Sequence, residues 1–191
     1  MAATESVNVN LESGARHESG HIVIAAVEGL KLKPEGLMVD ASGWGLACYH
    51  DAPDESDPSR ERNIIAVLAG FAVEKRFREQ RSYPAREYLD ITWNDDNRKA
   101  RTLLGRLSGY YSLNESRLRN QLHHLVETYW LSIDLLACAL LGKDWEPIKP
   151  LKSGGKWSNA NEIMAKYVSG EEAVRILAQQ QGITATCDAE G

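Results

Sequence analysis

Residues 15–27 read ARHESGHIVIAAV, a polar motif that runs directly into an apolar segment. Its His17, Glu18 and His21 form an HExxH pattern. Residues four positions apart lie ~40° apart around an α-helix, so the two histidines point the same way, while Glu18 is rotated by ~100° from His17. The apolar continuation indicates a helix buried on one side. The stretch therefore predicts a helix that carries two imidazoles on one face and a carboxylate beside them.

This spacing is typical of a metal site. Two imidazoles at positions i and i+4 can reach one metal ion at ~2.0–2.1 Å. Glu18 then lies beside the ion, where it can hold and deprotonate a metal-bound water, as metal-assisted peptide hydrolysis requires. The alternative is a structural histidine pair whose polar atoms are satisfied by partners inside the fold.

A catalytic zinc ion needs a third protein ligand and an open coordination position. The candidates are Glu74, Asp95, Asp96, His50, His123 and His124. His123 and His124 are adjacent and cannot face each other on a helix, so we assign neither to the metal. Glu74 is the runner-up ligand, but our preferred role for it is to orient a ligating imidazole through the other ring nitrogen. The alternative for Glu74 is a solvated helix face next to Lys75 and Arg76.

Three segments resemble the protease domain of the FtsH-type AAA zinc metalloproteases. HESGH at 17–21 is similar to that family's HEAGH, LAGFAVE at 68–74 to its LAGRAAE, and NDDNRKA at 94–100 to its SND-x-x-x-A segment. Their order and spacing match over roughly residues 15–143. The resemblance implies a zincin-like HExxH helix packed on a second helix, and the activity of a zinc metalloendopeptidase.

The resemblance also implies an aspartate from the third segment as the third zinc ligand. The family's aspartate precedes an alanine by four residues, which selects Asp96 here, with Ala100 as the alanine. Alignment on the Asn-Asp pair selects Asp95 instead. The expected site is one Zn²⁺ per chain, held by His17, His21 and Asp96.

Residues 42–49 resemble the family's strand beside the metal. Gly45, Leu46 and Ala47 are therefore candidate substrate contacts, because an exposed strand can pair with an extended peptide through backbone hydrogen bonds. An ordinary packed hairpin explains the same residues equally well.

The remaining patterns predict one mainly α-helical domain over residues 1–191 with a small β element. Its parts are a flexible start (1–10), a metal-site half (about 11–110), a helical half that forms a C-terminal bundle (about 111–182) and a tail (183–191). We expect helices at 11–28, at 59–79 and at 94–108. Two more helices begin at capping boxes: one runs from 112–115 to about 140, and the other from 169–172 to Gly182. Strands are expected at 36–39 and 45–49, a proline- and glycine-rich connector at 143–157, and irregular structure at 81–93.

Composition excludes several function classes. Lys and Arg number 22 against 27 Asp and Glu, a net charge of −5 without a basic stripe, so nucleic acid is not an expected partner. The longest apolar runs, 22–27 and 135–141, are far shorter than the ~20 residues of a membrane span. Three cysteines without a CxxC pattern are typical of free thiols in a reducing compartment, and we expect a cytoplasmic protein.

Members of the resembled family join this protease domain to an ATPase that unfolds substrates. The sequence contains no G-x-x-x-x-G-K-[ST] pattern, since Trp157 follows Gly154-Gly155-Lys156. We expect no ATP site, peptides or already unfolded segments as substrates, and a separate unfoldase as the partner for folded ones; oligomeric state is left open. The alternative function is a catalytically retired domain that keeps its metal and acts as an adaptor or regulatory module.

Overall fold

The computed structural model describes residues 8–83, 91–149, 151–152, 156–157, 162–180 and 182–188. These residues form a mainly helical domain with a small antiparallel sheet, as the sequence predicts. The elements, in chain order, are α1 (Val9–Val27), β1 (Leu32–Asp40), β2 (Gly45–Tyr49), α2 (Asp57–Gln80), α3 (Ile91–Leu104), α4 (Tyr111–Thr128), α5 (Trp130–Leu141), β3 (Glu146–Ile148), β4 (Leu151–Lys152), β5 (Lys156–Trp157), β6 (Ile163–Val168) and α6 (Gly170–Leu177).

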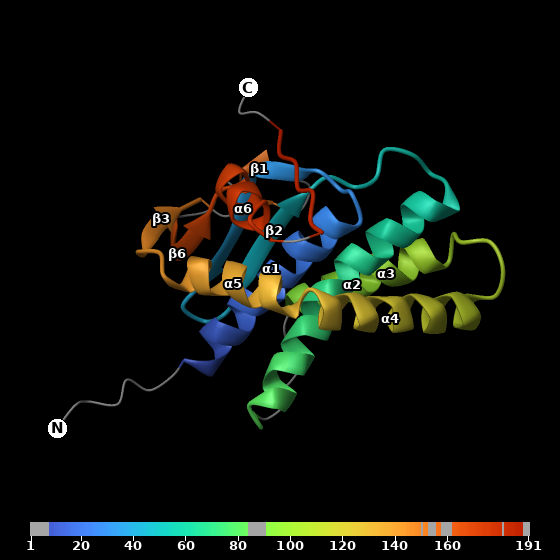
Figure 1. Ribbon diagram of the computed structural model, residues 1–191, viewed down its shortest axis with the longest axis horizontal. Coiled ribbons are helices and arrows are strands. Elements are labelled where there is room, and N and C mark those ends of the chain that lie inside the picture. Colours follow the sequence, from blue (N-terminus) through green and yellow to red (C-terminus); the bar gives the residue numbers. More distant parts are fainter. Residues whose placement is uncertain are drawn as a thin grey trace.

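Helix α1 lies at the centre of the molecule (Figure 1). It packs against α2, against α5, and against β1 and β2. Every residue from Ser13 to Ala26 is buried. The HExxH helix was predicted to be buried on one side only, and that prediction is wrong, because other elements cover it all round. Its polar residues therefore need partners within the protein.

The main sheet has the order β2-β1-β6-β3, and all its neighbouring strands are antiparallel. Strand β2 has its predicted bounds, while β1 is longer than the predicted 36–39. The hairpin turn between them is closed by Asp40, whose carboxylate accepts from the backbone N–H groups of Ser42 and Trp44, and by Gly43 at φ +83°. Such a positive φ favours glycine. The prediction missed β3 and β6, which lie in or after the segment taken as a connector.

The long C-terminal helix predicted from residue 112 is two helices. Helices α4 and α5 are bent by 67° at Tyr129. The capping box predicted at 112–115 is wrong, since α4 begins at Tyr111 without a side-chain cap. The cap predicted at Ser169 is confirmed, since its hydroxyl accepts from the backbone N–H of Glu172, although α6 ends at Leu177 and not at Gly182.

The C-terminal helices do not form a bundle of their own in the described part of the chain. Helix α4 packs mainly on α2, α5 on α1, and α6 on β1. The bend lets α5 turn away from α4 and cover the central helix instead. No single helix among the described residues is both long and apolar enough to span a membrane; α4 and α5 meet those criteria only when taken together across their bend.

Parts of the predicted ends and of the predicted irregular segment lie outside the described residues. Within the rest, α1 begins at Val9, earlier than predicted, with Asn8 as its N-cap. Helix α3 begins at Ile91 and not at 94. The described part of the tail pairs with the start of β1, since the backbone N–H of Leu32 donates to the carbonyl of Thr186 at 2.8 Å.

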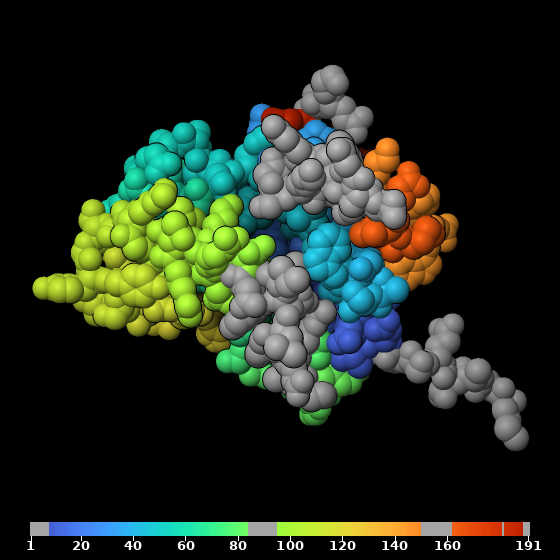
Figure 2. Space-filling view, turned by 180° about the vertical axis from the view of Figure 1, so that it is seen from behind, coloured from blue at the N-terminus to red at the C-terminus, as the bar shows by residue number. Residues whose placement is uncertain are grey.

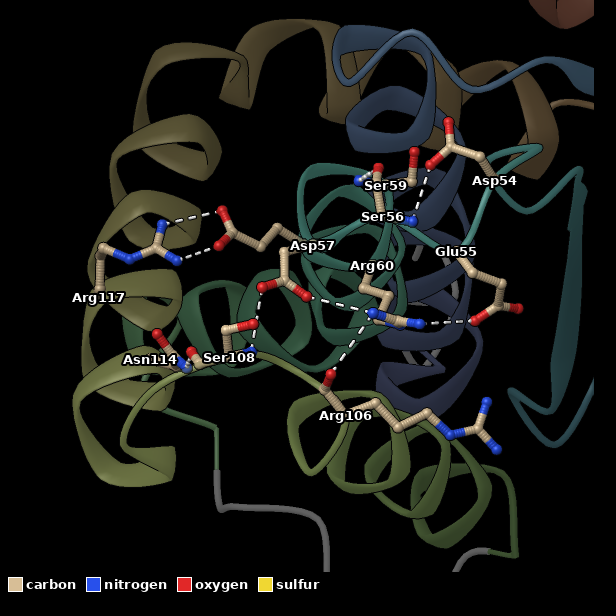
Figure 3. Close-up of polar contacts among 11 residues, drawn as sticks. Asp54, Glu55, Ser56, Asp57, Ser59, Arg60, Arg106, Ser108, Asn114 and Arg117 are labelled. Carbon is tan, nitrogen blue, oxygen red and sulfur yellow. Dashed lines mark hydrogen bonds and ion pairs between the residues drawn. The ribbon is translucent and has the colours of Figure 1, made fainter.

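Polar contacts attach the turn after α3 to the first turn of α2 (Figure 3). Asp57 accepts from the backbone N–H of Ser108 at 3.1 Å and from Arg60 at 3.2 Å. The N-cap of α2 is Ser56, which leaves the Asp57 carboxylate available for this contact. Arg117 of α4 forms a two-pronged ion pair with Glu61 of α2. The contact between Asp57 and Ser108 holds the turn that follows α3, and α3 carries Asp96.

The two faces of α5 should differ sharply in their contribution to stability. Leu136 is fully buried, whereas Leu131 on the same helix is 66% exposed. We expect Leu136→Ala to lower the free energy of unfolding by about 2–5 kcal/mol, because it leaves a cavity in the core. Leu131→Ala should change it by less than about 0.5 kcal/mol. Urea denaturation of both variants tests this, and equal losses would contradict the placement of α5.

Candidate metal centre

Three potential ligand side chains meet where α1 faces α3. His17 and His21 come from successive turns of α1, and Asp96 comes from the first half of α3. Oδ2 of Asp96 lies 3.4 Å from Nε2 of His17 and 3.3 Å from Nε2 of His21. Within the part of the chain that the structure describes, these three residues form a group that could hold a metal ion.

The two distances suit a shared metal ion better than direct hydrogen bonds. N–H···O bonds have donor–acceptor distances of about 2.7–3.2 Å. Ligand atoms bound at ~2.0–2.1 Å at the corners of a tetrahedron lie ~3.3–3.4 Å apart. Both separations from the Asp96 oxygen match this edge length. The two edges from Asp96 therefore fit a four-coordinate site, and the three ligand atoms all lie within 4.8 Å of one another.

The other ring nitrogen of each histidine has an acceptor. Nδ1 of His21 lies 2.8 Å from the carbonyl oxygen of Ala66, and Nδ1 of His17 lies 3.1 Å from Oε2 of Glu74. A carbonyl and a carboxylate can only accept, so Nδ1 carries the hydrogen in both rings. In the neutral form of each ring, Nε2 then keeps a lone pair for a metal. Glu74 thus lies behind His17, in the orienting position preferred from the sequence.

The structure separates the two neighbouring aspartates. Asp95 is exposed and pairs with Arg98 at 2.7 Å, outside the group. His50 pairs instead with Asp188 near the chain end, at 2.6 Å. His123 borders a groove between α2 and α4, and His124 is exposed on α4. Of these candidates for the third ligand, only Asp96 joins the two histidines.

Several carboxylates lie close to His17 and His21. Burial opposes the charging of His17, yet interactions with the Asp96 and Glu74 carboxylates outweigh it and raise the pKa of that imidazole to about 10. A metal ion would therefore bind His17 in place of a proton. Although burial acts to raise it, the pKa of Asp96 is lowered by His21 and His17. Carboxylates of Glu18, Glu74 and Asp96 surround the two rings. Such a concentration of negative charge favours a bound cation.

The side chain of Glu18 packs against strand β2 at Gly45. A Cβ placed on Gly45 would come within 2.5 Å of Cγ of Glu18, so only glycine allows the strand to pass this close. Burial raises the pKa of Glu18, while His17 and His21 act to lower it. Figure 2 shows part of α1 at the bottom of a recess between α3 and the β1–β2 hairpin. Leu46 and Ala47, the other candidate substrate contacts, are half-buried on β2.

Close packing of α1 on α2 depends on two glycines. A Cβ on Gly70 of α2 would lie 2.4 Å from Nε2 of His21 and 2.5 Å from Nε2 of His17. A Cβ on Gly20 of α1 would lie 2.8 Å from the Val73 side chain. Gly70 therefore borders the metal-facing atoms themselves.

Sequence reasoning missed three contributors to the site. The Ala66 carbonyl is a backbone group, which a residue pattern does not reveal. Ser13 and Arg78 are buried next to Glu74. The spacing of Arg78, four residues after Glu74, could have indicated an ion pair on one helix face.

Comparisons of the chain with known protein families, with curated proteins and with solved structures find no match. The resemblance to FtsH-type proteases therefore depends on the three sequence segments alone. The geometry described above is independent of it.

Gly70→Ala should weaken metal binding without unfolding the protein. The added methyl group would overlap both Nε2 atoms, so the imidazoles must turn away from their common point. We expect zinc affinity to fall by at least about tenfold, comparable to the loss of a second-layer contact. The matched control is Gly105→Ala, where the nearest atoms lie at an ordinary 3.5 Å. Isothermal titration calorimetry with zinc measures both, and unchanged affinity in Gly70→Ala would contradict the site.

Proposed function

We propose that this chain is a zinc-dependent metalloendopeptidase that hydrolyses peptide bonds in peptides or unfolded protein segments. The observation that carries the proposal is the convergence of His17, His21 and Asp96, in which both histidines lie at the spacing of tetrahedral ligands from Asp96. Two imidazoles and a carboxylate are a ligand set that zinc uses in catalytic sites. A fourth position is then left for water or substrate.

The chain's own residues supply the remaining chemistry. A zinc ion, when bound, polarises the scissile carbonyl and lowers the pKa of a coordinated water to about 7. Glu18 follows the first ligand in sequence, and we assign it the role of taking a proton from that water and passing it to the leaving amine. Burial raises the pKa of Glu18, which brings the carboxylate closer to the neutral range where a general base is most effective.

Strand β2 is the proposed binding element for the substrate. It is an edge strand of the main sheet and pairs only with β1 among the described residues. Gly45 brings this strand directly against Glu18. A peptide that extends the sheet at β2 would therefore run beside the general base. Backbone pairing recognises any extended chain, which fits unfolded segments as substrates.

Glu18 supports an enzyme over a metal-holding adaptor. The residue is only 6% exposed, and burying a charged group is costly. An adaptor that only binds metal does not need a proton acceptor at this position. We further propose that the protein works in the cytoplasm, without a nucleotide site of its own, and that folded substrates need a separate unfoldase.

The assignment of the third ligand makes a direct prediction about metal content. We expect the protein to bind about one zinc ion per chain, and His17→Ala and Asp96→Ala to lose most of it, because two ligands do not complete the shell. Asp95→Ala is the matched control and should keep its zinc, since Asp95 pairs with Arg98. Elemental analysis by mass spectrometry measures the ratio. If only Asp95→Ala loses zinc, the third ligand is Asp95 and not Asp96.

Replacement of the general base should separate catalysis from binding. Glu18→Gln keeps the shape of the side chain but cannot accept a proton, so peptide hydrolysis should fall about 10²–10⁴-fold. Zinc content and melting temperature should stay near those of the parent. Glu12→Gln, on the same helix and farther from the metal, should keep the parental rate. Cleavage of a fluorogenic peptide library measures these rates.

Two results would count against the mechanism. If Glu18→Gln cleaves peptides as fast as the parent, Glu18 is not the base. If parent and variant both hold zinc and neither cleaves, the adaptor becomes the better interpretation.

A further inference from the structure

A buried polar network extends from the metal centre along the seam between α1 and α2. Glu74 uses both carboxylate oxygens: Oε2 accepts from His17, and Oε1 accepts from the hydroxyl of Ser13 at 2.8 Å and from Nε of Arg78 at 3.1 Å. Nε of Arg78 also lies 2.9 Å from the Ser13 hydroxyl oxygen. Nη2 of Arg78 donates to the side chain of Asn10 at 3.1 Å. The chain of contacts thus runs from His17 to the start of α1.

Helical periodicity brings these side chains together. Ser13 precedes His17 by one turn of α1, and Arg78 follows Glu74 by one turn of α2. All four side chains therefore face the same interface. Ser13 is fully buried, and Glu74 and Arg78 are each only 6% exposed. A carboxylate buried this deeply needs a counter-charge, and the Arg78 guanidinium provides it.

The two oxygens of one carboxylate share a plane, so fixing one directs the other. Contacts from Ser13 and Arg78 hold Oε1, and Oε2 is then aimed at Nδ1 of His17. We propose that Arg78 and Ser13 are positioning residues of the metal centre, which hold Glu74 and through it set the tautomer and ring orientation of His17. The inference rests on the proposed zinc site and assigns it a supporting layer.

The chemistry of arginine matters for this role. A guanidinium presents several N–H groups in a rigid planar fork, so Arg78 can contact Glu74, Ser13 and Asn10 at once. A lysine ammonium keeps the charge but not the fork. Loss of a partner that orients a metal ligand typically weakens metal affinity about 10–100-fold. We expect Arg78→Gln to lower zinc affinity by a factor in that range, and we expect Arg78→Lys and Ser13→Ala to lower it by smaller factors.

Metal binding can be measured apart from peptidase activity. The zinc affinity of each variant is determined by competition with a chromophoric chelator, and the visible spectrum of the cobalt(II)-loaded protein reports the ligand geometry. Arg76→Gln is the matched control. Arg76 lies on the same helix, pairs with Glu127 and lies 3.9 Å over the Trp130 ring, away from the network. The Arg76→Gln protein should keep the zinc affinity and the cobalt spectrum of the parent, even if its free energy of unfolding is lower.

A double-mutant cycle identifies the route of the effect. If Arg78 acts through Glu74, Arg78→Gln should add little to the affinity already lost in Glu74→Gln. Full additivity would overturn the proposal. So would parental zinc affinity and cobalt spectrum in a folded Arg78→Gln protein.

Circular dichroism of the metal-free proteins establishes folding before each titration. Should Arg78→Gln fail to fold, Arg78→Lys and Ser13→Ala decide: weakened zinc binding with an altered cobalt spectrum supports the proposal, and parental values in both reject it. A parent protein that binds no zinc would reject the proposed function and this inference with it. Zinc binding by the parent with unaffected variants would reject the inference alone.

Discussion

The close contact between α1 and α2 is the constraint on which the rest of the structure depends. It places the Ala66 carbonyl and the Glu74 carboxylate within reach of the two Nδ1 atoms of α1. Those two hydrogen bonds turn both Nε2 atoms toward the same point. The contact is possible because Gly20 and Gly70 leave no side chain in the seam. A larger residue at either position would separate the helices or displace the imidazoles.

Burial of α1 on every side imposes a second requirement. Its first half carries charged and polar side chains that an ordinary core would exclude. Arg16 illustrates how they are accommodated: it pairs with Asp134 of α5 at 2.7 Å and lies 4.1 Å over the Phe77 ring. Helix α5 therefore contributes both apolar packing and a charge partner to the central helix. Polar residues fit here because their partners come from three different elements.

Local patterns in the sequence predicted the local parts of the site. The common direction of His17 and His21 follows from helical spacing alone, and the two strands of the β1–β2 hairpin were predicted at 36–39 and 45–49. The position of Asp96, and not Asp95, beside the histidines agrees with the register taken from the resemblance. The break at Tyr129 was missed because apolar residues keep a helical period across it. Strand β6 was missed because it pairs with β1, from which it is distant in the chain.

Helix α3 supplies Asp96 from a part of the chain remote from the HExxH helix, and it is fastened at its far end through the turn that Asp57 holds. A metal ion bound to His21 and Asp96 would act as a cross-link between two distant segments. Such a link holds the two segments together in the folded protein. Binding that is restricted to the folded form also stabilises that form in proportion to the logarithm of ligand concentration. The ion would then be part of what keeps the domain closed.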